Sequence, residues 1–248
     1  MKVLLTVMAA VLGVSLTAAQ AAEVKVVGSP GFRQAYTALV PGFEKASGNK
    51  INTNWGGVNE VAKRVADGET ADVVILPVAQ IDDLIAKGKL LAPTRVIVAK
   101  SGVGVAVKAG APKIDLSSSD NVRKALLAAK SIAYSTGPSG AHMAELIKKW
   151  GIADQLKGKI VIAPADTPVG EVLARGQAEI GFQQVSELIH AKGVDYLGAL
   201  PPDSNEITVF AAAVHKDSRA QDAARALIKH LSAPEAAPVI KNAGMVPG

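Results

Sequence analysis

Residues 135–140 combine hydroxyl side chains and glycines in a way that could bind an anion. The run Ser-Thr-Gly-Pro-Ser-Gly follows an apolar, strand-like segment and leads into a helical pattern. The first N–H groups of a helix have no partner within the helix, so such a turn directs free donors at a ligand. No Lys follows Gly140, so the turn is not the phosphate loop of nucleotide hydrolases. Taken alone, these residues more often form an ordinary helix cap.

The residue patterns of the common enzyme classes are missing from the sequence. Ser139 lies in Gly-Pro-Ser-Gly-Ala rather than in the G-x-S-x-G turn of hydrolases, and Ser139 with His142 lacks an evident third member. The histidines at 142, 190, 215 and 230 do not have the spacing of a metal site. Asp82 and Asp83 begin a helix, where carboxylates favour the dipole. We therefore expect a binding protein that is not an enzyme and that uses no cofactor and no metal.

Residues 1–21 have the pattern of a secretory signal peptide. One Lys precedes an apolar run, and Ala19-Gln20-Ala21 forms a cleavage site, after which we expect processing. The chain has no Cys, so no disulfide can stabilise the exported protein and no lipid anchor can follow the signal. An unanchored binding protein would diffuse away unless an outer membrane confined it. We therefore expect a periplasmic location.

Composition argues against nucleic acid and membranes as partners. The formal net charge is +5, but the basic residues do not cluster beyond Lys148-Lys149, late in a helix. Aromatic residues make up 4% of the chain, too few for a base-stacking surface. Lys, Asp or Gly interrupts every later apolar stretch, so we expect no membrane insertion. The sequence predicts a monomer with a mild preference for small anionic ligands.

Apolar strands and helices alternate in the first third of the chain. Strands are predicted at 24–27, 50–54 and 72–76, each followed by a helix. This order is typical of βαβ units around a parallel sheet. Consecutive strand segments then follow at 94–112, before strands and helices alternate again and two helices close the chain. The fold class predicted is α/β.

Two α/β lobes joined by two crossings of the chain explain this order most simply. We expect a first lobe of residues 22–93 plus 205–248 and a second lobe of residues 94–204. Each lobe would hold a mostly parallel sheet flanked by helices, with crossings near 91–95 and 204–207. Ligands of such sheets bind outside the carboxyl ends of the strands. The strand–helix junctions expected to face one cleft, two from each lobe, are residues 28–31, 55–59, 135–140 and 166–168.

Segments spread over nearly the whole chain match one protein family in order, spacing and length. They are VVGSPGFRQAYTALVPGFEKASG, ADVVILP, GPSGAHMAELIKKWGI, LARGQAEIGFQQVSEL and ALIKHLSAPEAAPVIKNAGM. They resemble the periplasmic solute-binding proteins of ABC importers, in particular the molybdate-binding group. The resemblance implies the two-lobed type II fold, an anion held between the lobes, and delivery of that anion to an importer permease.

The resemblance also implies which residues contact the ligand. The group holds a tetrahedral oxyanion with hydroxyls and backbone N–H groups and without a countercharge. The first ligand-binding Ser of the group falls on Ser29. The second falls near Val58, so its hydroxyl is lost here, although the amide of Val58 and the side chain of Asn59 can donate. Its Tyr falls on Gln184, which offers an acceptor as well as donors. The residues expected to bind the ligand are Ser29, Gly57, Val58, Asn59, Ser139, Gly140, Asp166 and Gln184.

Molybdate or tungstate, captured by hinge closure, is the ligand that the resemblance implies. The altered positions leave two alternatives open, a small organic acid as the ligand and a role as an exported ligand-binding sensor component. Three further side chains have open roles. Arg33 and His142 could reach the cleft or lie on helix surfaces, and Trp55 could form an apolar wall of the cleft or belong to a lobe core.

Overall fold

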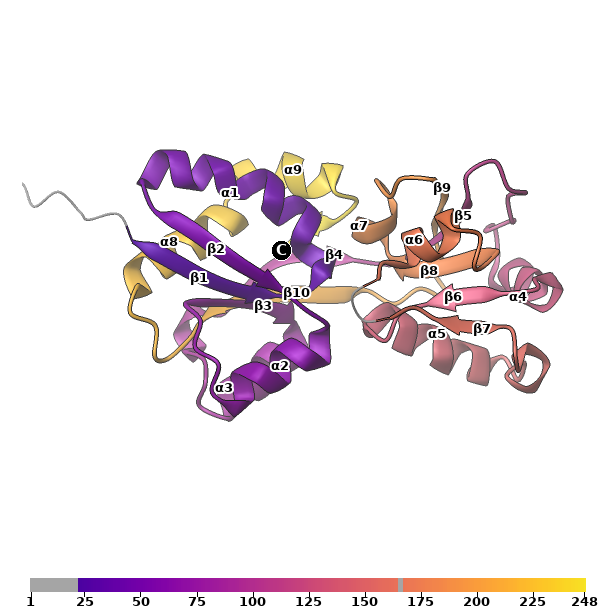
Figure 1. Cartoon of the computed structure of the whole chain (residues 1–248), viewed down its shortest axis with the longest axis horizontal. Coiled ribbons are helices and arrows are strands. Elements are labelled where there is room, and N and C mark those ends of the chain that lie inside the picture. The colour runs from indigo at the N-terminus through magenta and orange to yellow at the C-terminus, as the bar shows by residue number, and fades with distance from the viewer. Residues whose placement is uncertain (1–21, 165–166) are drawn as a thin grey trace, which may run out of the picture.

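The protein consists of two bodies side by side, each built on a β-sheet (Figure 1). The computed structural model describes residues 22–164 and 167–248, so the predicted signal at 1–21 and the predicted contact residue Asp166 lie outside the described residues. Both ends of the described chain belong to the first body, and the middle of the chain forms the second. No helix in the described ranges is long and apolar enough to span a membrane.

The first sheet has six strands in the order β11-β4-β10-β3-β1-β2. Along β3, Val73 and Ile75 pack in one core, whereas Val74 and Leu76 pack in another on the opposite face. Burial on both faces explains why this segment reads as a continuous apolar run. The strands span Glu23–Gly28 (β1), Lys50–Trp55 (β2), Val73–Pro77 (β3), Val96–Ser101 (β4), Thr208–Val214 (β10) and Val246–Pro247 (β11).

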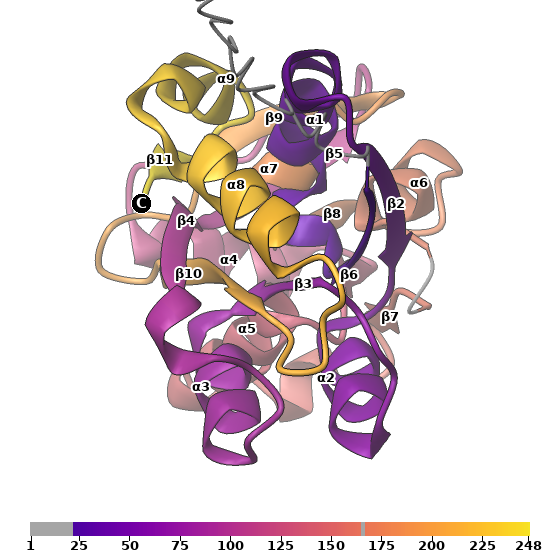
Figure 2. The same ribbon diagram turned by 90° about the vertical axis from the view of Figure 1, so that its left-hand side faces the viewer.

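Helices cover both faces of the first sheet (Figure 2). Helices α1, α8 and α9 pack on one face, and α2 and α3 on the other. A 3-10 turn at Pro30–Phe32 leads into α1, which ends at Gly48 with a φ of 74°, a conformation that glycine adopts without strain. The helices span Arg33–Ser47 (α1), Val58–Asp67 (α2), Val78–Ala86 (α3), Gln221–Ser232 (α8) and Ala237–Asn242 (α9).

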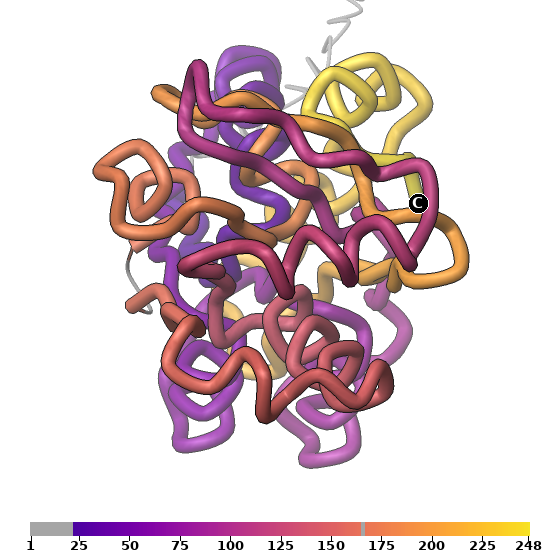
Figure 3. Tube along the Cα trace, turned by 90° about the vertical axis from the view of Figure 1, so that its right-hand side faces the viewer, coloured from indigo at the N-terminus to yellow at the C-terminus, as the bar shows by residue number. Residues whose placement is uncertain are grey.

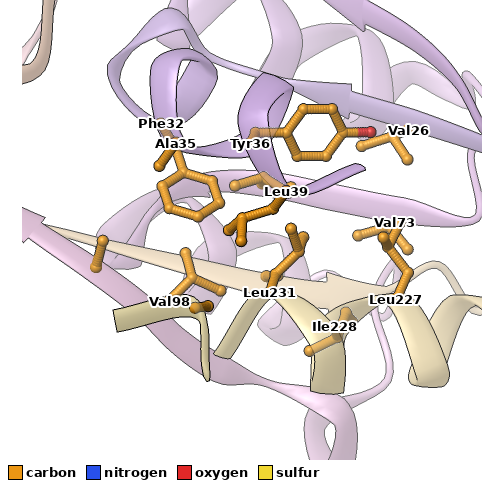
Figure 4. Close-up of a cluster of buried hydrophobic side chains, with 14 of the residues drawn as sticks. Val26, Phe32, Ala35, Tyr36, Leu39, Val73, Val98, Leu227, Ile228 and Leu231 are labelled. Carbon is orange, nitrogen blue, oxygen red and sulfur yellow. The ribbon is translucent and has the colours of Figure 1, made fainter. Parts of the chain in front are cut away.

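The larger core of the first body lies between the sheet and helices α1 and α8 (Figure 4). Phe32, Tyr36 and Leu39 at the start of α1 pack with Leu227 and Leu231 of α8, and all are buried. The last helices therefore pack on the first body, as the sequence predicts. The same packing holds the start of α1, and with it the loop at residue 29, in a fixed position.

The second sheet has five strands in the order β7-β6-β8-β5-β9, and Figure 3 views this body from its outer end. Strand β9 has no counterpart among the predicted elements. The strands span Val103–Lys108 (β5), Ile132–Tyr134 (β6), Ile160–Ile162 (β7), Ile180–Gln184 (β8) and Val194–Ala199 (β9). The helices span Ser119–Ala128 (α4), Pro138–Lys149 (α5), Val169–Ala174 (α6) and Val185–Leu188 (α7).

The chain crosses between the two sheets after β4 and after β9. Strand β4 pairs with β10 in the first sheet, so the first crossing lies at Gly102 and the expected crossing near 91–95 is wrong. The reason is that β4 and β5 form one β-branched, glycine-containing run, in which no residue marks the change of sheet. The second crossing lies between β9 and β10, a stretch that includes the expected 204–207. We propose Gly102 in place of residue 94 as the first lobe boundary.

Both sheets are mixed rather than mostly parallel. Strands joined by a helix run parallel, as in β1-β2, β1-β3 and β6-β7. Strand β10 is antiparallel to β3 and β4, and β5 is antiparallel to β8 and β9. These two strands enter their sheets directly from the other body.

Candidate ligand-binding site

A cavity of about 490 Å³ lies where the loops of the two bodies meet. The loops after β1, β2 and β6 and the loop before α6 all line it, so the structure brings together the predicted strand–helix junctions. The ends of β8 and β10 complete the wall. Of the predicted contact residues, those that line the cavity are Ser29, Gly57, Val58, Asn59, Ser139 and Gln184.

Ser29 presents a buried hydroxyl to this cavity. The residue is 1% exposed, and its backbone N–H donates to the Ile75 carbonyl at 3.1 Å. Within the described residues, its Oγ has no hydrogen-bond partner. Gly28 before it permits this close packing, because a Cβ there would lie 2.9 Å from the Trp55 ring. Leaving a buried polar group unsatisfied costs about 1–3 kcal/mol, so Ser29 Oγ is suited to a ligand or a water.

Arg33 and Trp55, whose roles were open, both line the cavity. The guanidinium carbon of Arg33 lies 5.3 Å from the centroid of the Trp55 ring, within the range of a cation–π contact. Trp55 in turn meets Tyr36 edge to face, with ring centroids 5.1 Å apart. Among the residues that the structure describes, Arg33 forms no ion pair. Trp55 therefore supports a positive charge at the cavity as well as forming its wall.

Two helix N-termini add backbone donors to the cavity. Gly57 precedes α2, so the first free amides of that helix belong to Val58 and Asn59. In α5 the first residue is Pro138, which has no N–H, so the free amides of its first turn begin at Ser139. Both N-termini carry the positive end of a helix dipole, which favours a negatively charged ligand.

Gly140 shapes the loop before α5 and does not line the cavity. A Cβ at this position would lie 1.6 Å from the carbonyl oxygen of Ser135, so only glycine lets the loop pack against the first turn of the helix. The loop is further held because the Gly137 N–H donates to Ser135 Oγ at 3.3 Å. The glycine predicted as a ligand contact therefore positions the neighbouring donors.

Gln184 links the two bodies at the cavity. Its Nε2 donates to Oγ1 of Thr208 at 2.8 Å, so one of the donors that the sequence interpretation assigned to the ligand is already used. The residue is 2% exposed, and its Oε1 has no partner in the described part of the chain. Gln184 thus offers an unpaired acceptor, whereas Ser29 on the opposite body offers an unpaired hydroxyl.

The sequence interpretation missed several cavity residues, and the polar ones are Glu60, Gln183 and Glu187. Glu60 forms an ion pair with Arg64. Gln183 Oε1 accepts from the Val169 N–H at 2.8 Å, and its Nε2 donates to Glu187 Oε1 at 2.8 Å. Burial raises the pKa of Glu187 to about 7, against the opposing effect of the Arg33 charge. No sequence motif marks the pair Gln183 and Glu187, because Gln183 lies in strand β8 and Glu187 in the short helix α7 that follows it.

His142, which could reach the cleft or lie on the helix surface, does not line the cavity. Its Nε2 lies 2.7 Å from the Ser204 carbonyl, and its Nδ1 lies 2.7 Å from a carboxylate oxygen of Glu206. Both ring nitrogens are therefore engaged with the segment between β9 and β10. The ring fastens α5 to the second crossing of the chain.

Helix α7 attaches the second body to the first beside the cavity. The hydroxyl of Ser186 donates to the Gly31 carbonyl at 2.6 Å, and both residues are buried. The His190 ring contacts the Asn242 carbonyl at 2.8 Å. The two walls of the cavity are therefore joined by hydrogen bonds on this side.

Two α/β bodies joined by two crossings, with a cavity of anion-binding character between them, define a two-lobed ligand-binding protein of type II. The chain belongs to the bacterial extracellular solute-binding protein family, whose model matches residues 24–246. The resemblance to the molybdate-binding group of these proteins, inferred from the sequence, is confirmed by two of the similar proteins described next.

Three similar proteins illustrate the range of the family. An aconitate isomerase from Pseudomonas sp. is 33% identical over 238 residues, which cover 94% of this chain and 90% of that protein. The molybdate-binding protein ModA of Azotobacter vinelandii is 28% identical, with 94% and 93% covered. The solved structure of the periplasmic molybdate-binding protein from Azotobacter vinelandii superposes with a TM-score of 0.76 at 24% identity, covering 91% of this chain and 99% of that one.

Proposed function

We propose that this protein binds a small organic acid with several carboxylates in the cavity between its lobes. The observation that carries the proposal is the Arg33 guanidinium, which lines the cavity and stacks on Trp55. A guanidinium matches a carboxylate with two parallel hydrogen bonds. The molybdate-binding pattern implied by the sequence lacks such a countercharge, so Arg33 favours the organic acid over the tetrahedral oxyanion.

The size of the cavity and one of the relatives support the same choice. At about 490 Å³ the cavity is in the range of sites for small organic molecules. The Pseudomonas relative is named for aconitate, a tricarboxylic acid. Ser29 Oγ, the first-turn amides of α2 and α5, and Arg33 would be distributed over different carboxylates, so each charge would meet its own donors.

Molybdate or tungstate is the competing candidate, because the Azotobacter relative is a molybdate-binding protein. Ser29 and the two helix N-termini suit either ligand. Gln184 Oε1 discriminates between ligands with and without a proton donor, since it is an acceptor without a partner in the described chain. A deprotonated oxyanion and a fully ionised carboxylate both offer it no proton. An organic acid with a hydroxyl or a protonated carboxyl can donate to it.

The ligand would be captured by hinge closure in the periplasm and passed to the permease of an ABC importer. Ligand contacts from both lobes stabilise the closed form relative to the open one and so shift the population. The family membership supports this role, and the predicted signal at 1–21 supports the location. No enzymatic step is needed for transport itself.

A calorimetric titration of the purified protein tests the proposal. The panel contains trans-aconitate, citrate and the saturated analogue tricarballylate on one side, and molybdate, tungstate and sulfate on the other. We expect at least one tricarboxylate to bind at least about 100-fold more tightly than any oxyanion, a difference of about 2.8 kcal/mol. Tight binding of molybdate or tungstate with no binding of any carboxylate would refute the proposal.

A further inference from the structure

Glu187 is a feature of the cavity that anion binding does not explain. The side chain is half-buried and lines the same cavity as Arg33 and the helix N-termini. An ionised carboxylate repels an anionic ligand at close range, so a site built only to hold an anion gains nothing from it. The Glu187 carboxyl can favour binding in its protonated form by donating a hydrogen bond to the ligand, or it can exchange its proton with the ligand.

The carboxyl of Glu187 is held in one orientation by its neighbour. Gln183 Oε1 accepts from the Val169 N–H at 2.8 Å, which fixes the amide so that its Nε2 points to Glu187 Oε1, also at 2.8 Å. In the part of the chain that the structure describes, no hydrogen bond to Oε2 of Glu187 is seen. A carboxyl with one oxygen anchored and the other unoccupied in a ligand cavity has the geometry of a general base.

The environment also sets the proton affinity of this group. Burial raises the pKa of Glu187 to about 7, and the positive charge of Arg33 opposes the rise. A catalytic acid or base works best when its pKa lies near the operating pH, because both the acceptor and the donor form are then populated. Glu187 can therefore both accept a proton from the ligand and donate one to it.

We propose that Glu187 moves a proton between two carbons of an unsaturated tricarboxylate bound in the cavity, so that the protein isomerises such a ligand as well as binding it. The proposal rests on the proposed function, since it needs a tricarboxylate in this site. It assigns an activity to a cavity that the sequence interpretation treated as a binding site alone.

The step is a redox-neutral shift of one proton. The carboxylate of Glu187 removes a proton from the methylene carbon beside the double bond, and that C–H bond breaks. The electron pair forms a new double bond to the central carbon, while the former double bond becomes a carbanion conjugated with its carboxylate. The protonated Glu187 then delivers the proton to that outer carbon. The double bond has moved by one position, and the carboxyl of Glu187 is restored to its ionised form.

The same residues that bind the acid would stabilise the intermediate. Removing a proton adds negative charge to a carboxylate, and Arg33 and the first-turn amides of α5 are fixed donors that need no reorganisation at that moment. Positively charged and dipolar groups aimed at developing charge are often the largest contribution to such a reaction. The cavity thus supplies both a base and a charge-stabilising wall.

Proton NMR in D₂O tests this activity directly. With trans-aconitate as the probe, the wild-type protein should introduce deuterium at the methylene position and form the cis isomer. The variant Glu187→Gln keeps an acceptor for Gln183 but cannot exchange a proton, so we expect both processes to fall by about 100-fold or more. Its affinity for tricarballylate, which has no double bond to move, should stay within about 3-fold of wild type. The matched control Glu145→Gln, on the exposed side of α5, should match the wild type in both assays.

Each result distinguishes the two proposals. If the wild type binds tricarballylate but neither isomerises nor labels trans-aconitate, the isomerase inference is wrong and the binding function stands. If Glu187→Gln isomerises as fast as wild type, Glu187 is not the base and the inference fails as stated. If no tricarboxylate binds at all, the proposed function fails and takes this inference with it.

Discussion

Replacing Arg33 by methionine should weaken the binding of a tricarboxylate and leave the fold intact. Arg33 is exposed at the first position of α1, and its guanidinium lies 5.3 Å from the Trp55 ring centroid. Methionine retains an unbranched apolar stem for the contact with Trp55 and removes only the charge and the donors. The substitution therefore isolates the charged part of the proposed interaction.

The magnitude follows from the exposure of the side chain. A hydrogen bond to a charged group contributes about 1.5–3 kcal/mol. Because Arg33 is solvated before the ligand arrives, the lower part of this range applies, about 1.5–2 kcal/mol. The dissociation constant for tricarballylate should therefore rise by about 10- to 30-fold. Arg33→Lys keeps the charge without the planar fork and should lose less.

Calorimetry at constant ionic strength measures the change, and Arg225→Met serves as the matched control. Arg225 is also an exposed arginine of the first body, on α8, and does not line the cavity. We expect the control to bind as the wild type does. Equal affinities of wild type and Arg33→Met for tricarballylate would show that the guanidinium does not contact the ligand, and the preference for a carboxylate over an oxyanion would lose its basis.

Three further substitutions have expected outcomes of different sign. Ser29→Ala removes a buried hydroxyl without a partner in the described chain, so the ligand-free variant should be at least as stable as the wild type. Its binding of tricarballylate should weaken by about 1–2 kcal/mol. Thermal melts with and without ligand separate the two effects. Gly140→Ala places a Cβ 1.6 Å from the Ser135 carbonyl oxygen, so it should lower the free energy of unfolding in urea titrations by at least about 1–3 kcal/mol. The control Gly137→Ala, whose Cβ would meet its nearest atom at 3.5 Å, should lower it by less than about 1 kcal/mol. Glu187→Gln should gain stability relative to wild type as pH rises from 4.5 to 7, because the carboxyl of the unfolded wild type ionises near pH 4.5 and that of the folded wild type only near pH 7. The gain is about 3 kcal/mol at most. The prediction is contradicted if the difference in melting temperature between variant and wild type is the same at pH 4.5 and pH 8.

The fold was largely predictable because its elements repeat a simple pattern. The apolar run predicted as a strand at 72–76 forms β3 at Val73–Pro77, and a helix follows it as expected. The crossing at Gly102 was not predictable in the same way. Strands β4 and β5 have similar composition, and only their pairing partners, more than a hundred and about eighty residues away, decide which sheet each one joins.

In the candidate site too, features that depend on local sequence were predictable and features that depend on tertiary contacts were not. The junctions that contain Ser29, Val58 and Ser139 were found because a strand end followed by a helix start is visible in the sequence. The family resemblance then implied these three residues as ligand contacts. Glu187 was not found, because its significance comes from burial and from a hydrogen bond to Gln183 rather than from any motif. The role of Gly140 also required coordinates, since the approach of Ser135 to its Cα is a contact between backbone segments.

His142 shows that locating a residue in a helix does not settle the direction of its side chain. The residue lies in the first half of α5, as predicted, but the helix turns its ring toward Ser204 and Glu206 instead of the cavity. The direction of a side chain depends on how the helix rotates on its sheet. That rotation is set by buried residues such as Met143 and Leu146, which pack against the core of the second body.

A crystal structure of the protein grown with tricarballylate tests most directly whether the cavity between the lobes is an organic-acid site. We expect the ligand to bridge the two lobes, with one carboxylate on the Arg33 guanidinium, another at Ser29 Oγ, and a third at the first turn of α5 near Ser139. Tricarballylate bound elsewhere, or a cavity that takes up molybdate from an equimolar mixture and leaves the acid in solution, would contradict this prediction.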